Sequence, residues 1–345
     1  MPRELLLVAP RTVALAEYEP PRLTPTSAML RTVFSAVSHG TEMLLYRGEA
    51  PKFLHGWDDE LRHFVPRTPT TPQAPLPLGY ESVARVVEVG AEAQGLAAGD
   101  LVWVDAPHRE IHIIDTKRPP PMWRFPEHCD PRSLAFFALT RVALGAVHDA
   151  EPVLGGSAVV SGLGVVGQLC GQLLRLAGVR HVFGIDRDPD RLALAERFGI
   201  IPVLAEPGDP AAAIKKQMPG VDVAIEASGR YAGLASALRC LSPMGRVVVV
   251  SSYGNQVTGL SLGHEFHRNR ITLVSSMTVN GCPHPKAPLW SLERLNQAAA
   301  DLISDGSLEV LPLITSIVPF QTAPEAYRVI DGQTTPPLKV LFAYG

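Results

Sequence analysis

This chain of 345 residues lacks paired cysteines, blocks of basic residues and long apolar runs. Its four cysteines are far apart and form no C-x-x-C pair, which argues against a disulfide framework and a thiolate zinc site. The formal net charge is −3, so nucleic acid and anionic membranes are not expected partners. No apolar run approaches the roughly 20 residues of a membrane helix, and the first residues do not form a basic leader followed by an apolar segment. We therefore expect a soluble, cytoplasmic protein.

Two kinds of hydrophobic pattern divide the chain. Residues 1–128 and 288–345 contain short β-type runs and turn signals, which predict one β-rich domain built from both ends of the chain. Residues 129–287 alternate Val- and Ile-rich runs with segments of helical periodicity, which predicts a parallel sheet covered by helices on both faces. The predicted fold class is α/β, with a doubly wound sheet in the second domain.

The most specific motif is "VVSGLGVVGQLCGQLLRLAG", in which a strand is followed by a glycine-rich turn and a helix. Gly162 permits the tight turn, Gly164 allows the backbone to approach a pyrophosphate, and Gly167 allows the helix to pack closely on the strand. Val165 and Val166 begin the helix, whose N-terminus favours negative charge. This pattern predicts a dinucleotide-binding site.

Asp186 ends the next predicted strand, where a carboxylate can accept hydrogen bonds from the ribose hydroxyls of NAD. Its charge would repel the 2′-phosphate of NADP, so NAD is favoured, although Arg187 or Arg191 could turn towards such a phosphate. Three serines follow the ends of later strands and are expected near the nicotinamide half of the cofactor, although each could equally be an ordinary turn residue: Ser228, Ser251 and Ser252.

Several segments in the same order resemble the medium-chain dehydrogenase/reductase superfamily, which includes alcohol and polyol dehydrogenases. They are "GYESVARVVEVG", "AAGDLVWVD", "GLGVVGQ", "VDVAIEASG" and "APEAYRVI" followed by "LKVLFAY". The resemblance covers nearly the whole chain. It implies a GroES-like catalytic domain, a Rossmann domain, and hydride transfer in a cleft between them. It also suggests that "ITLVSS" is an edge strand through which a homodimer or homotetramer assembles.

The chain departs from the zinc-binding pattern of that superfamily. By resemblance, His39 in "SHGTEM" stands where a cysteine ligand is usual, and Tyr80 stands where a histidine is usual. The third ligand position falls in "FFALTRVALG", which contains no Cys, Asp, Glu or His. The structural-zinc loop of four cysteines is also missing. A catalytic zinc needs about three protein ligands, so we expect no metal, with His148, Asp149 and Glu151 as distant alternatives.

Without zinc, side chains must move the proton that accompanies hydride transfer. Histidine side chains commonly titrate near neutral pH, so His39 could act as the acid or base. Thr41 stands at the position of the proton-relay hydroxyl, and Tyr80 could donate a hydrogen bond to the substrate oxygen. Glu81 could orient one of these groups or hold an arginine beneath the site, and an ordinary structural ion pair is its simplest role.

These features favour an NAD-dependent oxidoreductase that acts on a secondary alcohol or ketone of a polyol, sugar or similar hydroxylated molecule. Alternatives are a zinc-dependent alcohol dehydrogenase with altered ligands, an NADPH-dependent enoyl or quinone reductase, and a non-catalytic dinucleotide sensor. The segment from Leu44 to Phe64 is expected either to shape the substrate pocket as a loop or to form an exposed amphipathic helix.

Overall fold

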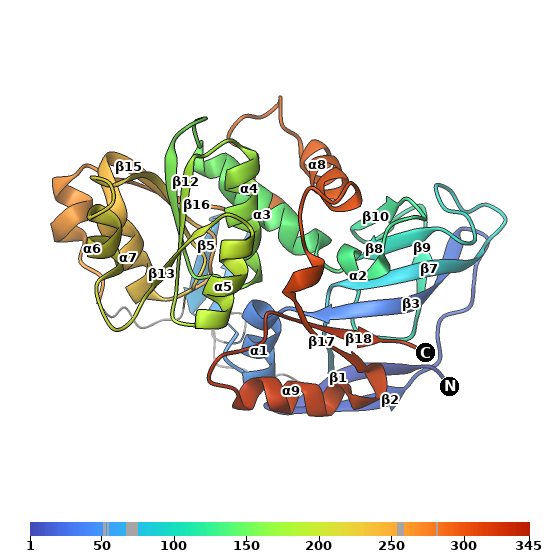
Figure 1. The fold of residues 1–345 in the computed structure, drawn as a ribbon. Coiled ribbons are helices and arrows are strands. Elements are labelled where there is room, and N and C mark those ends of the chain that lie inside the picture. Colours follow the sequence, from blue (N-terminus) through green and yellow to red (C-terminus); the bar gives the residue numbers. More distant parts are fainter. Residues whose placement is uncertain (51–52, 54, 67–74, 254–258, 281) are drawn as a thin grey trace. The chain divides into compact units, whose positions relative to one another are not determined.

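The computed structural model describes residues 1–50, 53, 55–66, 75–253, 259–280 and 282–345. The chain folds into two compact units (Figure 1): unit 1 comprises Met1–Ala135 and Leu313–Gly345, and unit 2 comprises Phe136–Pro312. The sequence predicted the division at 128/129 and at 287/288. The second division lies later because helix α8 (Leu292–Ser304) buries Leu295, Ala299 and Ile303 and packs on α3 (Phe137–Ala150) of unit 2.

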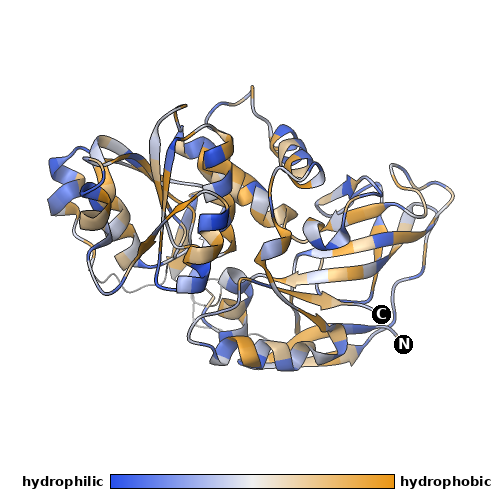
Figure 2. Cartoon of the chain, in the orientation of Figure 1, coloured by the Kyte–Doolittle hydropathy of each residue, from blue (hydrophilic) through white to orange (hydrophobic). Residues whose placement is uncertain are grey.

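Unit 2 is built on a parallel sheet with the strand order β13-β12-β11-β14-β15-β16. Its central strands are rich in valine and isoleucine because both of their faces are buried, and they are largely orange in Figure 2. Strand β16, which contains most of "ITLVSS", lies at the edge of the sheet as predicted. The strands are β11 (Ser157–Ser161), β12 (His181–Asp186), β13 (Ile201–Leu204), β14 (Val221–Glu226), β15 (Leu241–Val249) and β16 (Thr272–Ser275).

Helices cover this sheet on both sides, with α3 packed on α4 and α6 packed on α7 (Figure 1). Aspartates at 188 and 209 and a serine at 291 cap helix N-termini by accepting backbone hydrogen bonds, which explains why these helices begin where they do. The remaining helices of unit 2 are α4 (Val165–Leu176), α5 (Pro189–Arg197), α6 (Pro210–Lys215) and α7 (Tyr231–Cys240), with short turns η2 (Leu262–Phe266), η3 (Thr278–Asn280) and η4 (Leu311–Leu313), which ends in unit 1.

Unit 1 is mainly β-structure. One sheet has the order β10-β8-β7-β3-β18-β17, with β9 also paired to β3, and a smaller sheet has the order β2-β1-β6. Strand β18, near the C-terminus, lies between β3 and β17, so both ends of the chain contribute to the sheet, as predicted. The strands are β1 (Arg3–Ala9), β2 (Thr12–Glu17), β3 (Ser27–Val37), β4 (His55–Asp58), β5 (His63–Pro66), β6 (Leu76–Pro77), β7 (Ser82–Val89), β8 (Leu101–Val104), β9 (Ile111–Asp115), β10 (Met122–Phe125), β17 (Ile314–Pro319) and β18 (Lys339–Ala343).

Short helices complete unit 1. Helix α9 packs on β2, and its Tyr327 is fully buried in a core with Leu5, Leu7 and Phe342. Where the structure describes it, the segment from Leu44 to Phe64 is neither a loop throughout nor the amphipathic helix that the sequence suggested. Its first residues form the end of helix α1. Strands β4 and β5 follow and pair antiparallel, with Trp57 opposite Phe64. The helices are α1 (His39–Arg47), α2 (Pro131–Leu134) and α9 (Ala323–Gly332), with the turn η5 (Phe320–Thr322).

Across the residues that the structure describes, we find no helix with the length and apolar character needed to cross a membrane.

Candidate active site

The turn between β11 and α4 has the geometry that its glycines predict. Gly162 has φ +93°, a conformation that L side chains rarely adopt. A Cβ on Gly167 would lie 1.8 Å from the carbonyl oxygen of Gly162, so only glycine allows this approach of helix to strand. Gly164 is the extended N-cap, and Val165 and Val166 begin the helix. The first-turn amides of α4 therefore form a site for a negatively charged group, and the residues fit a dinucleotide pyrophosphate.

Asp186 lies at the end of β12, beside this turn. Its Oδ2 accepts a hydrogen bond from the backbone N–H of Leu163 at 2.7 Å, and its Oδ1 accepts from the N–H groups of Arg187 at 2.7 Å and Asp188 at 3.0 Å. The Nη1 atom of Arg191 lies 3.8 Å from Oδ2. The carboxylate thus anchors the glycine turn and is held by fixed donors, a structural role that the sequence did not reveal. Arg187 is exposed, whereas Arg191 pairs with the aspartates.

Two of the serines predicted near the nicotinamide, Ser228 and Ser251, contact Glu226, whose buried carboxylate sequence reasoning missed. Glu226, at the end of β14, is fully buried and accepts hydrogen bonds from the backbone N–H and the hydroxyl of Ser228. Its other carboxylate oxygen accepts from the Tyr253 hydroxyl at 2.5 Å. Ser251 donates to the backbone oxygen of Glu226 at 3.4 Å, whereas Ser252 is exposed. Ser228 and Ser251 are therefore brought together at Glu226. The sequence signal that could have revealed this carboxylate is the glutamate that ends the apolar run "VDVAIE".

In unit 1, the N-terminus of helix α1 brings together hydroxyl groups from two distant segments. The Tyr80 hydroxyl donates to Oγ of Ser38, the helix N-cap, at 2.5 Å, and it also has a hydrogen bond with the exposed Thr41. Burial, followed by the negative charge of Glu81, raises the pKa of Tyr80. Tyr80 is therefore a protonated donor at neutral pH. His39 begins the same helix and is half-buried, with a buried Nε2.

Glu81 follows Tyr80 but points into the protein. It is fully buried and forms an ion pair with Lys339 of β18. Burial raises the pKa of Glu81, although the lysine opposes this shift. Its observed partner is thus a lysine rather than the arginine that the sequence suggested. The contact fits the structural ion-pair role, because a fully buried carboxylate paired in this way does not reach a substrate.

A second buried carboxylate supports the same helix. Glu42 accepts hydrogen bonds from the backbone N–H of Ser38 at 2.7 Å and from the Tyr327 hydroxyl, and it pairs with Nε2 of His108 at 3.0 Å. Burial alone would raise the pKa of Glu42, but His108 and these donors lower it. Sequence reasoning missed this network because its members are far apart in the chain. The one sequence signal for this network is that Tyr327 lies on the apolar face of a helix, where its hydroxyl needs a buried partner.

A zinc ligand set does not form among the described residues, in which no three Cys, His, Asp or Glu side chains converge. Glu81 is paired with Lys339, and Tyr80 donates to Ser38. Of the more distant alternatives, Nδ1 of His148 is engaged by His284. Because catalytic zinc requires about three protein ligands, the residues present do not fit one.

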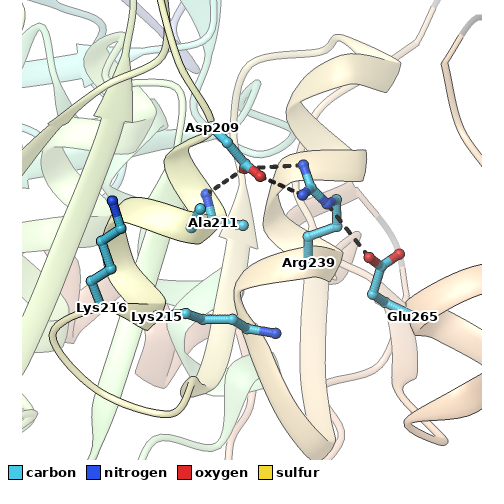
Figure 3. Close-up of a pocket in the computed structure, with 7 residues that line it drawn as sticks. Asp209, Ala211, Lys215, Lys216, Arg239 and Glu265 are labelled. Carbon is cyan, nitrogen blue, oxygen red and sulfur yellow. Dashed lines mark hydrogen bonds and ion pairs between the residues drawn. The ribbon is translucent and has the colours of Figure 1, made fainter.

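Another hollow of unit 2 lies between helices α6 and α7 (Figure 3). Its volume is 390 Å³. Two carboxylates hold its arginine: Arg239 donates to both carboxylate oxygens of Asp209, and its Nε lies 3.5 Å from Glu265. Because its arginine is already neutralised, this hollow does not offer a free guanidinium to a charged ligand.

Comparison with known proteins agrees with the dinucleotide-binding motif and the fold described above. Residues 165–293 match the family model described as "Zinc-binding dehydrogenase". The chain is also 30% identical to D-guloside 3-dehydrogenase of Escherichia coli (strain K12) over 333 residues, which is 94% of this chain and 95% of that protein. The chain belongs to the zinc-binding dehydrogenases of the medium-chain dehydrogenase/reductase superfamily.

Two further relatives bear on the fold and the reaction class. The chain is 26% identical to (R,R)-butanediol dehydrogenase of Bacillus subtilis (strain 168) over 242 residues, which is 63% of this chain and 68% of that protein. A solved structure from Sinorhizobium meliloti 1021, described as a zinc-binding dehydrogenase and bound to NADP, has a TM-score of 0.79 and 21% identity and covers 99% of both chains. The relatives support a nicotinamide-dependent alcohol or polyol dehydrogenase, and the predicted fold is confirmed.

Proposed function

We propose that this protein is an NAD-dependent dehydrogenase that needs no catalytic zinc and moves hydride between nicotinamide and a secondary alcohol or ketone of a sugar, glycoside or polyol. The observation that carries the proposal is the Tyr80 hydroxyl, which Ser38 and Thr41 hold at the N-terminus of α1. By resemblance, this tyrosine stands in place of a zinc-ligating histidine.

Side chains of unit 1 supply the proton transfer in this proposal. In the reducing direction, Tyr80 donates a hydrogen bond that stabilises the negative charge developing on the substrate oxygen, and protonated His39 supplies the proton. In the oxidising direction the same proton path runs in reverse, and neutral His39 accepts the hydroxyl proton. Thr41 is exposed at the start of α1 and links the substrate oxygen to solvent. Glu81, Glu42 and Lys339 position this helix and do not touch the substrate.

Unit 2 holds the cofactor in this proposal. Acceptance and donation of hydride is the chemistry that a bound NAD supplies. The turn from Gly162 to Gly167 would hold its pyrophosphate, and Asp186 would accept hydrogen bonds from the adenosine ribose. We favour NAD over NADP because Arg191 is paired with Asp186 and Asp188, so the aspartate remains the dominant charge at the ribose.

The substrate class rests on the relatives. D-guloside 3-dehydrogenase matches over nearly the full length of both chains, and its name specifies oxidation of a sugar derivative. The name of (R,R)-butanediol dehydrogenase specifies a secondary diol. We therefore rank glycosides and sugars first and simple polyols second.

A substrate screen tests the proposal directly. Purified protein is incubated with NAD or NADP and with methyl glycosides, free sugars, polyols and butanediols, and cofactor reduction is followed at the absorbance of reduced nicotinamide. We expect NAD reduction with at least one glycoside or sugar. Turnover restricted to NADPH with enoyl or quinone substrates would indicate the reductase alternative. Cofactor binding without turnover on either panel would indicate a sensor.

A further inference from the structure

A second pocket of unit 2 shares no lining residue with the candidate active site. It has a volume of 340 Å³, within the range of small-molecule sites. Helix α4 begins at the cofactor turn and reaches this pocket at its other end, about 16 Å away at the rise of an α-helix. The pocket has an aliphatic wall from helices α3, α4 and α8, formed by Leu144, Val147, Leu173, Leu176 and Leu302.

The polar lining of this pocket includes a histidine whose protonation is fixed by its neighbours. The backbone N–H of Lys286 donates to Nδ1 of His284 at 3.0 Å, so this nitrogen carries no proton. The proton of neutral His284 is therefore on Nε2, which lies 2.9 Å from Nδ1 of His148 and donates to it. His148 must then carry its own proton on Nε2. The paired geometry keeps both rings neutral, because a proton on Nδ1 of His148 would face the N–H of His284.

Other observations agree with this assignment. Burial and the neighbouring His284 lower the pKa of His148 to about 4, and burial lowers the pKa of His284. Both rings pack against Trp290, with centroids 4.4 Å and 5.7 Å from the tryptophan ring. The Nε2–H of His148 forms no hydrogen bond within the part of the chain that the structure describes. His148 lines the pocket and uses Nδ1 for His284, so its Nε2–H is the ring donor left for a ligand, and it carries no positive charge.

Lys286 adds a positive charge to the same lining. It is exposed, and its ammonium forms no ion pair with any described residue. The opposing charge in the lining is Glu151, whose Oε2 lies 3.3 Å from Nη2 of Arg246 and is thereby partly neutralised. The pocket thus combines an aliphatic wall with two hydrogen-bond donors, one of them cationic.

We propose that this pocket binds a small carboxylate with an aliphatic tail. The tail packs among the leucines of α3, α4 and α8, and the carboxylate accepts hydrogen bonds from Nε2 of His148 and from the Lys286 ammonium. This site is distinct from the proposed dehydrogenase chemistry, and its test does not require turnover.

Calorimetric titration of the full-length protein with sodium octanoate tests the proposal, with 1-octanol as the ligand that lacks the carboxylate. We expect saturable octanoate binding and at least tenfold weaker binding of 1-octanol. Lys286→Gln should weaken octanoate binding by about tenfold, the usual effect of losing a charged hydrogen bond. Leu176→Asp should also weaken it, because it places a negative charge at an exposed position of the wall. Lys216→Gln, at an exposed lysine of helix α6's C-cap, is the matched control and should have no effect.

Three results would overturn the proposal: no saturable binding of octanoate, equal binding of octanoate and 1-octanol, or equal binding by the Lys286→Gln and Lys216→Gln variants. The melting temperature of each variant is measured without ligand. Both exposed lysines can be replaced without disturbing the core, so a loss of binding by Lys286→Gln at an unchanged melting temperature reports on the pocket itself.

Discussion

The cofactor turn of unit 2 and the hydroxyl cluster of unit 1 are specified in different ways. The turn depends on backbone geometry within a few residues: Gly162 supplies a positive φ, and Gly167 supplies the close approach of helix to strand. The cluster at Tyr80 depends on side chains from distant segments, with Glu42 and Lys339 behind it. The cofactor turn, which a few neighbouring residues specify, can therefore stay the same while the cluster at Tyr80, which distant residues assemble, takes on different chemistry.

Replacement of Gly167 should give the largest effect. Its Cβ would overlap the Gly162 carbonyl, so Gly167→Ala should lower the free energy of unfolding by about 3 kcal/mol, at the upper end of overpacking effects, and abolish NAD binding. Gly164→Ala is the matched control, because nothing lies within 4 Å of that Cβ. It should keep the stability and weaken only NAD binding. Chemical denaturation and NAD titration measure both quantities, and equal stability loss in the two variants would contradict a locally encoded turn.

Loss of the Tyr80 hydroxyl should give the next largest effect. Tyr80→Phe should lower kcat by about 10²–10³ because it removes the hydrogen-bond donor to the developing negative charge on the substrate oxygen, with an unchanged melting temperature. Ser38→Ala should have a smaller effect on kcat, since it removes only the acceptor that orients this hydroxyl. Steady-state kinetics with the best substrate from the screen measures both variants. A Tyr80→Phe enzyme with wild-type kcat would remove Tyr80 from the mechanism.

Asp186 should have a moderate effect on cofactor choice. Asp186→Asn keeps a side-chain oxygen for the N–H of Leu163 but loses the negative charge that repels a 2′-phosphate. We expect the ratio of kcat/KM for NAD to that for NADP to fall by about tenfold, or 1.4 kcal/mol. Arg187→Ala is the companion variant. If it lowers activity with NADP only, the exposed arginine supports binding of the phosphate, and an unchanged ratio in Asp186→Asn would argue against the aspartate as the selector.

Acid should destabilise unit 1 through His112, with an effect that stays small near neutral pH. Burial, followed by the charge of Arg109, lowers the pKa of His112 from 6.5 to about 3. The unfolded chain therefore binds a proton below about pH 6.5 that the folded protein does not bind. The free energy of unfolding should decrease as the pH falls from 6.5 towards 3, by at most about 1.4 kcal/mol per pH unit from this group. Denaturation at several pH values should show a shallower slope for His112→Gln; an equal slope would contradict this assignment.

The sequence predicted the parts of this protein that repeat a local pattern. The alternation of valine-rich runs and helices predicted the sheet of unit 2, and the glycine motif predicted the turn before α4. The segment after α1 was not predicted, because the pairing of Trp57 with Phe64 depends on a hairpin register that periodicity does not reveal. The boundary near residue 288 was misplaced because an amphipathic helix does not reveal which core its apolar face will join.

The candidate site divides in the same way. The action of Thr41 and Tyr80 on a substrate oxygen stays a prediction from their positions in the family pattern, and the residues that support them were invisible in the sequence. Glu42 and His108 are separated by many strands, and no spacing rule links them. Assembly into a homodimer or homotetramer stays a prediction, consistent with the edge position of β16.

The most direct test of the account measures metal content and turnover on the same sample. Protein is purified without added zinc and treated with a strong chelator, its zinc is quantified by elemental analysis, and NAD reduction is measured before and after treatment. The account predicts substoichiometric zinc and unchanged turnover, which His39→Ala or Tyr80→Phe then reduces strongly. Near-stoichiometric zinc, with activity that the chelator removes and added zinc restores, would contradict side-chain proton transfer as the replacement for the metal.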